Sequence, residues 1–66
     1  MSAPRTEATL NLFRNGKTTK QETINNLYYL KDWARIETKQ AATRAYGERW
    51  QAEYKAAQSA LRDLLR

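Results

Sequence analysis

The sequence predicts an all-α protein, and its composition is the first observation that supports this. Ten alanines, seven leucines and many Gln, Glu, Lys and Arg residues favour helix. The second observation is the scarcity of strand-forming residues, since the 66 residues include two isoleucines and no valine. The third is the spacing of the apolar residues, which recur at intervals of three and four, as on one face of a helix. We expect residues 1–66 to form a single small helical domain.

A short first helix is predicted near the N-terminus. Ser2 followed by Pro4 is a helix start signal, because proline is tolerated in a first turn, where its missing N–H would have no partner. The apolar residues of this helix are Leu10, Leu12 and Phe13. Asn15-Gly16 then closes it, since either residue supplies the left-handed conformation that often follows a last helical turn.

A second, much longer helix is predicted from Thr19. Thr19 and Glu22 match a capping box, in which each side chain accepts a hydrogen bond from an otherwise unpaired backbone N–H. No proline follows Pro4, and the later glycine, Gly47, costs a helix about 1 kcal/mol relative to alanine. One continuous helix to Leu65 would be roughly 70 Å long.

A helical hairpin is the alternative to that continuous helix. The chain would then break between Ile36 and Ala42, where Glu37-Thr38-Lys39-Gln40 could form a tight polar turn. Such a hairpin would pack Trp33 against Trp50 within one chain. The sequence leaves both arrangements open, and we expect the continuous helix because its apolar spacing keeps its phase across the gap.

Two apolar stripes predict that the chain assembles as a homodimer. The first has the spacing of a coiled-coil seam, and we assign it to dimerisation: Gly47, Trp50, Tyr54, Ala57, Leu61 and Leu64. The second stripe is rich in small residues, and we expect the first helix to pack on it: Ile24, Leu27, Lys31, Ala34, Thr38, Ala41 and Ala45. Because one stripe is enough to dock a helix on a core, the other needs a second subunit or an external partner.

The size and the missing residue types limit the classes of function. A chain this short buries only about 60% of its unfolded surface, so a partner subunit would help to complete its core. The absence of Cys and His excludes disulfides and tetrahedral zinc sites. No apolar run approaches the roughly 20 residues of a membrane span, and no secretory signal is visible. We expect a cytoplasmic protein without metal or cofactor.

The aromatic residues predict a partner-binding face. Tyr28 and Tyr29 are adjacent and point about 100° apart on a helix, so one helix face cannot bury both. Lys31, Arg35 and Lys39 follow at intervals of four and give this region a basic border. We therefore assign partner binding to Tyr28, Tyr29, Trp33, Arg35 and Ile36.

Nucleic-acid binding is the alternative function, because the formal net charge is +5. Its candidate residues are Lys31, Arg35, Lys39, Arg44 and Arg49. Against it, acidic residues interrupt the basic ones, and two i,i+4 pairs can form, Arg44 with Glu48 and Arg49 with Glu53. A solvated surface is therefore the better interpretation of the charge.

Catalysis has little support, since His and Cys are absent and no Gly-rich phosphate loop exists. We also expect the seven carboxylates at exposed positions, because they stand among Lys and Arg. In size and broad composition the chain resembles the small helical regulators and hairpin chaperones of phages, plasmids and secretion systems. That resemblance implies occlusion of a surface on a host protein. We expect a non-enzymatic, protein-binding regulator or inhibitor that modulates a larger protein.

Overall fold

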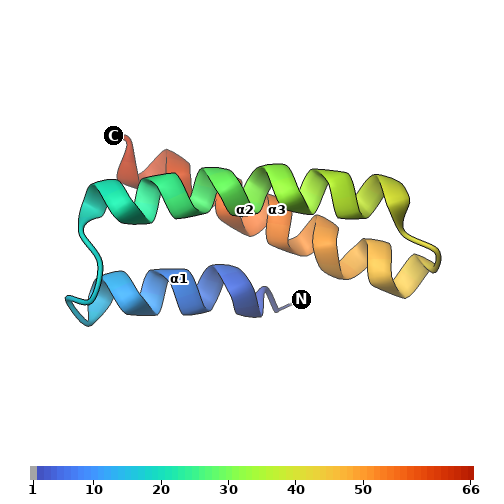
Figure 1. The fold of residues 1–66 in the computed structure, drawn as a ribbon, viewed down its shortest axis with the longest axis horizontal. Coiled ribbons are helices and arrows are strands. Elements are labelled where there is room, and N and C mark those ends of the chain that lie inside the picture. Colours follow the sequence, from blue (N-terminus) through green and yellow to red (C-terminus); the bar gives the residue numbers. More distant parts are fainter. Residues whose placement is uncertain (1) are drawn as a thin grey trace.

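A computed structural model describes residues 2–66 and shows three helices. These are α1 (Pro4–Arg14), α2 (Lys20–Gln40) and α3 (Arg44–Leu64). The two long helices run antiparallel and α1 folds back along them, so the molecule measures 36 × 17 × 16 Å (Figure 1). The prediction of an all-helical fold is confirmed.

The end of α1 follows the sequence signal. Gly16 has a φ of +74°, a left-handed conformation that glycine adopts without steric cost. The N–H of Gly16 donates to the carbonyl of Phe13 at 3.0 Å, and the N–H of Lys17 donates to the carbonyl of Leu12 at 2.8 Å. These paired bonds form a Schellman motif, which satisfies carbonyls that the last turn leaves free.

The start of α2 is the predicted capping box. The hydroxyl of Thr19 accepts from the backbone N–H of Glu22 at 3.1 Å, and the carboxylate of Glu22 accepts from the backbone N–H of Thr19 at 2.9 Å. Both donors would otherwise lack a helical partner. The boundary of this helix is therefore set by local chemistry.

The continuous helix expected over residues 19–65 is wrong, because α2 ends at Gln40 and the chain reverses into a hairpin. The turn lies later than the polar segment Glu37–Gln40, which is helical throughout. Ala41 and Thr43 are extended, and the Thr43 hydroxyl accepts from the backbone N–H of Tyr46 at 3.2 Å to begin α3. Burial of the facing apolar sides of the two helices stabilises this reversal.

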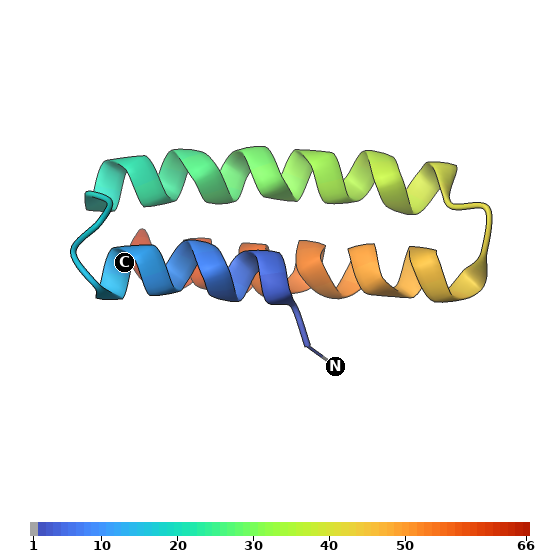
Figure 2. The ribbon, with the colours of Figure 1, turned by 60° about the horizontal axis from the view of Figure 1, so that its bottom comes forward.

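The hydrophobic core lies between α2 and α3, which run along each other in Figure 2. Its buried residues are Ile24, Leu27, Leu30, Ala34, Trp50, Ala57 and Leu61. Leu10 of α1, together with Tyr54, Ala60 and Leu64, packs against it. Leu30 belongs to neither stripe identified in the sequence. The hairpin therefore uses parts of both stripes within one chain.

Candidate functional site

Aromatic side chains from α2 and α3 contact each other in the half of the hairpin that lies nearer its turn. The ring centroids of Trp33 and Trp50 are 5.3 Å apart, with an angle of 37° between the planes. Tyr46, one turn before Trp50, follows at 6.4 Å. Such tilted pairs contribute about 0.5–1.5 kcal/mol beyond the area that they bury. The packing of Trp33 on Trp50 is the contact that the hairpin alternative requires.

Glu37 fixes the outer rim of this aromatic cluster. Its carboxylate accepts from the indole Nε1–H of Trp33 at 3.1 Å and from the hydroxyl of Tyr46 at 3.1 Å. One acidic side chain of α2 therefore holds an aromatic residue on each helix. Because these rings are held by packing and hydrogen bonds, they present a defined surface with little rotamer freedom left to lose on binding.

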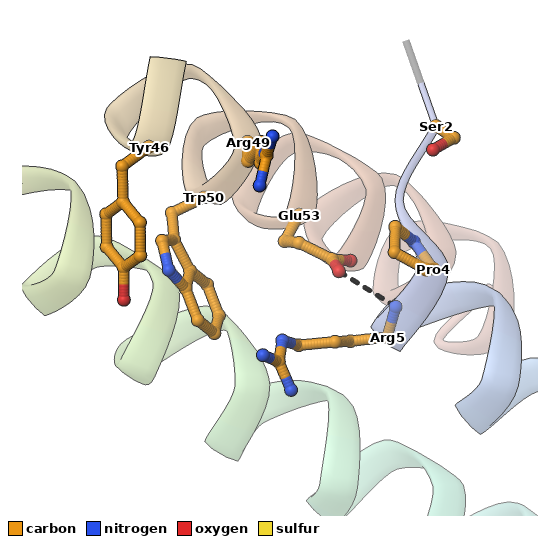
Figure 3. Close-up of a pocket in the computed structure, with 7 residues that line it drawn as sticks. All are labelled: Ser2, Pro4, Arg5, Tyr46, Arg49, Trp50 and Glu53. Carbon is orange, nitrogen blue, oxygen red and sulfur yellow. Dashed lines mark hydrogen bonds between the residues drawn. The ribbon is translucent and has the colours of Figure 1, made fainter. Parts of the chain in front are cut away.

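Arg5 of α1 completes the cluster. Its guanidinium carbon lies 4.7 Å from the centroid of Trp50 and 5.5 Å from that of Trp33, within the range of a cation–π interaction. Figure 3 shows the Arg5 side chain reaching from α1 toward the ring of Trp50. All three helices thus contribute to one site.

Glu53 positions the first turn of α1 and therefore Arg5. Its carboxylate accepts from the backbone N–H of Arg5 at 2.8 Å, and from the backbone N–H and the hydroxyl of Thr6 at 3.0 and 2.9 Å (Figure 3 draws the first of these bonds). A carboxylate at a helix N-terminus satisfies unpaired donors and complements the helix dipole. The N-cap residue, Ala3, has no side-chain acceptor, so the distant Glu53 caps α1 in place of a local residue.

The place of Glu53 corrects two expectations. The carboxylates were expected at exposed positions, but Glu53 is only 4% exposed. Glu53 was also expected to pair with Arg49, yet no ion pair joins these two residues in the structure of residues 2–66. The Glu53 carboxylate instead accepts hydrogen bonds from the α1 backbone, and the Arg49 side chain is exposed. The other expected pair, Arg44 with Glu48, forms at 3.0 Å.

A cavity opens between the first turn of α1 and the start of α3 (Figure 3). Its volume is about 410 Å³. Residues of both helices and of the segment before α1 line it: Ser2, Pro4, Arg5, Tyr46, Arg49, Trp50 and Glu53. The wall therefore combines two guanidinium groups with two aromatic rings.

The outward face of α2 carries the predicted partner-binding residues. Tyr29 is 75% exposed, Trp33 42% and Ile36 49%. Together with Asp32 they line an open groove along the helix. Tyr28 is also exposed, and Arg35 lines a neighbouring hollow with Lys39 and Tyr54. The structure thus brings three of the five predicted residues together in one groove.

The stripe assigned to dimerisation lies largely inside the chain. Trp50, Ala57 and Leu61 are buried against α2, and Tyr54 and Leu64 pack at the edge of the same core. A Cβ added at Gly47 would meet the Cβ of Ala41 in the hairpin turn at 3.3 Å. Gly47 therefore does mark a close approach, and the neighbour is a residue of the same chain.

Of the five basic residues assigned to nucleic-acid binding, Arg49 stands apart from the other four. The hollow at Arg35 and Lys39 and the hollow at Arg44 are contiguous, because both are lined by Thr38 and Gln51. Lys31 places its Nζ 5.7 Å from the ring centroid of Tyr54, and Arg44 pairs with Glu48. Arg35 and Lys39 line one hollow, Arg49 lines the cavity beside α1, and Arg44 lines a third hollow at the turn.

Sequence reasoning missed the parts of the site that depend on tertiary contacts. Arg5, Glu37, Tyr46 and Glu53 were not assigned to it, and no local pattern marks Arg5 or Glu53. The signal at Tyr46 was available, because Thr43 three residues earlier is a favourable N-cap residue. Placing α3 from that cap would have set Tyr46 and Trp50 on one side of a hairpin.

Residues 2–66 contain no group of three or more acidic side chains that could hold a metal ion. In the same range, none of the helices combines the length and the apolar character that crossing a bilayer requires. No protein-family model matches the chain, and no curated protein or solved structure shows significant similarity to it. Any functional assignment therefore rests on the geometry of the site.

Proposed function

We propose that this chain is a non-enzymatic, protein-binding regulator or inhibitor that docks the outward face of α2 on a larger protein. One observation carries the proposal, which is the groove formed by Tyr29, Trp33 and Ile36 on a helix whose opposite side fills the core. Single exposed apolar residues are ordinary, but a contiguous cluster of large ones is typical of an interface.

The register of these residues supports binding to a protein. They stand at i, i+4 and i+7 on one helix, which is the pattern by which a helix presents anchors to a groove or to another helix. Trp and Tyr are also the residues most enriched among those that dominate binding energy. The indole of Trp33 is already held by Trp50 and Glu37, so docking would order few side chains.

Nucleic-acid binding is the second candidate, and the hollow formed by Arg35, Lys39 and Tyr54 favours it. A ring flanked by cations can stack on a base while the cations contact phosphates. Arg49 lies apart in the cavity beside α1, and Arg44 is paired with Glu48, so fewer cations are available for phosphate contacts along one strand. This candidate is therefore weaker than docking on a protein.

The homodimer expected from the sequence is kept here as a proposal with less support. Its assigned stripe is occupied by the contact between α2 and α3, so a dimer would have to use the outward face of α2 instead. Light scattering at micromolar concentration tests this, because self-association would give about twice the 7.7 kDa chain mass.

Affinity capture from a cell lysate tests the proposed function. The wild-type chain is compared with Tyr29→Ala, and with Leu12→Ala as a matched control that removes an exposed apolar residue from α1. We expect a protein partner that survives nuclease and moderate salt, is lost with Tyr29→Ala and is kept with Leu12→Ala. Loss of the captured material on nuclease treatment would favour nucleic-acid binding, because nuclease degrades the strand that holds it. Loss at moderate salt would point the same way, because phosphate contacts weaken steeply as salt rises.

A further inference from the structure

We propose that the cavity between α1 and α3 binds the carboxylate of an acidic peptide segment. The inference rests on the proposed function, because that segment would belong to the protein partner. It assigns a second contact, distinct from the apolar groove on α2, and it names the chemistry of the group that enters it. The residues that carry the assignment are Arg5, Arg49 and the aromatic wall formed by Trp50 and Tyr46.

The first argument is that both guanidinium groups are available. Within residues 2–66, neither the Arg5 nor the Arg49 side chain forms an ion pair or a hydrogen bond. Arg5 is held by its cation–π contacts with Trp33 and Trp50, which leave its N–H donors unused. A guanidinium has a planar fork of donors that matches the two oxygens of a carboxylate.

The second argument concerns Glu53, which lines the same cavity but forms no direct ion pair with either guanidinium group. Both of its oxygens accept hydrogen bonds from the first turn of α1, at 2.8–3.0 Å. The Glu53 carboxylate is therefore bound to the first turn of α1. An incoming anion could contact Arg5 and Arg49 without displacing Glu53.

The third argument is the charge count, which selects a carboxylate over a phosphate. Two guanidinium groups and one carboxylate leave one net positive charge at the cavity. A single carboxylate balances that charge. A phosphomonoester carries about −1.5 to −2 at neutral pH and would leave the site negative beside the buried Glu53. The excess negative charge of a phosphate would be repelled by the Glu53 carboxylate in the same cavity.

The fourth argument is continuity with the groove on α2. Trp33 lines that groove and also packs on Trp50, which lines the cavity, so the two sites share one aromatic wall. The ring of Trp50 gives the body of an acidic residue an apolar surface to lie against. A partner segment that places an apolar side chain on α2 could therefore place a nearby carboxylate at Arg5.

Binding is measured with two peptides that differ only in the carboxylate, acetyl-Leu-Glu-Leu-amide and acetyl-Leu-Gln-Leu-amide. Tryptophan emission and the indole N–H signal of Trp50 report binding directly, because the chain has two tryptophans and Trp50 lines the cavity. We expect the Glu peptide to bind at least about tenfold more tightly than the Gln peptide, since charge-assisted hydrogen bonds are roughly twice as strong as neutral ones. Equal binding of the two peptides would overturn the proposal, as would tighter binding of inorganic phosphate than of the Glu peptide.

Arg49→Gln is the main variant, because the Arg49 side chain makes no ion pair or hydrogen bond among residues 2–66 and its loss should leave the fold intact. Arg62→Gln, at an exposed position near the end of α3 and outside the cavity, is the matched control for net charge. We expect Arg49→Gln to remove the preference for the Glu peptide and Arg62→Gln to keep it. The same loss in both variants would show a general charge effect and contradict the site. Capture of the partner that depends on Tyr29 but tolerates Arg49→Gln would overturn this inference and leave the proposed function standing.

Discussion

The carboxylate of Glu53 accepts hydrogen bonds from both the backbone N–H and the hydroxyl of Thr6, although 47 residues separate the two in the chain. Thr6 is the buried residue of α1, and Leu10 is only partly buried against the core. The docking of α1 thus combines this buried polar contact with the partial burial of Leu10. Because Arg5 precedes Thr6, the same contact places the guanidinium over Trp33 and Trp50.

Removal of the Glu53 carboxylate should therefore release α1. Glu53→Ala leaves the Thr6 hydroxyl and two backbone N–H groups without their partner, and we expect a loss of about 2–4 kcal/mol in the free energy of unfolding. Urea unfolding measures that loss. Amide exchange should rise in α1 more than in α2, because α2 keeps its capping box and its contact with α3.

Glu48→Ala is the matched control on the same helix. Its carboxylate pairs with the exposed Arg44, and an exposed ion pair of this kind contributes about 0–1 kcal/mol. Equal stability losses in Glu48→Ala and Glu53→Ala would show that Glu53 does not act as the cap of α1.

The hairpin itself predicts a compact particle in solution. The Cα radius of gyration is 11.9 Å. A continuous helix of roughly 70 Å would give a radius of about 20 Å, so small-angle scattering separates the two without labels. We expect a value near that of the hairpin at low protein concentration. A radius close to that of the rod would restore the continuous helix expected from the sequence.

The helix ends that local chemistry controls could be predicted from the sequence, and the turn could not. Thr19 with Glu22 and Asn15 with Gly16 act through neighbouring residues, so their patterns are visible in the chain. At the turn, Ala41 and Ala42 favour helix, and neither a glycine nor a proline ends α2. Thr43 is a local start signal for α3, but one N-cap residue does not by itself break a continuous helix. Only the packing of α2 on α3 outweighs that preference, and packing has no short sequence pattern.

The same division applies to the candidate site. The exposure of at least one of Tyr28 and Tyr29 followed from their adjacency, since one face cannot bury both rings, and both are in fact exposed. The roles of Arg5 and Glu53 could not be predicted, because they arise from a contact between the first turn of α1 and the middle of α3. The acidic residue that looked like the i,i+4 partner of Arg49 is instead the cap of a distant helix.

Gly47 should be intolerant of large side chains. A Cβ at this position already lies 3.3 Å from the Cβ of Ala41, so further atoms must push the hairpin turn away. We expect Gly47→Leu to lower the free energy of unfolding by about 1–3 kcal/mol, as overpacking does. Ala45→Leu is the control, since position 45 is exposed in the same turn of α3. A Gly47→Leu protein with a higher melting temperature than wild type would show that the hairpin turn can move to accommodate the larger side chain without loss of stability.

Tyr29 and Trp33 should separate binding from folding. Tyr29 is 75% exposed, and its substitution by alanine should change stability by no more than about 0.5 kcal/mol. Trp33 packs on Trp50, lies under Arg5 and donates to Glu37, so Trp33→Ala should cost about 1–3 kcal/mol of stability. Thermal unfolding of the two variants measures this difference.

Both variants should nevertheless lose affinity for a protein partner, by about 2 kcal/mol or more, because both rings line the groove on α2. Calorimetry at a temperature well below both melting points keeps the stability loss of Trp33→Ala out of the comparison. The decisive variant is Tyr29→Ala, whose fold should be unchanged. Full affinity in a folded Tyr29→Ala protein would remove the α2 face as the docking surface, whatever Trp33→Ala does, because Trp33 also has a structural role and Tyr29 is mostly in solvent.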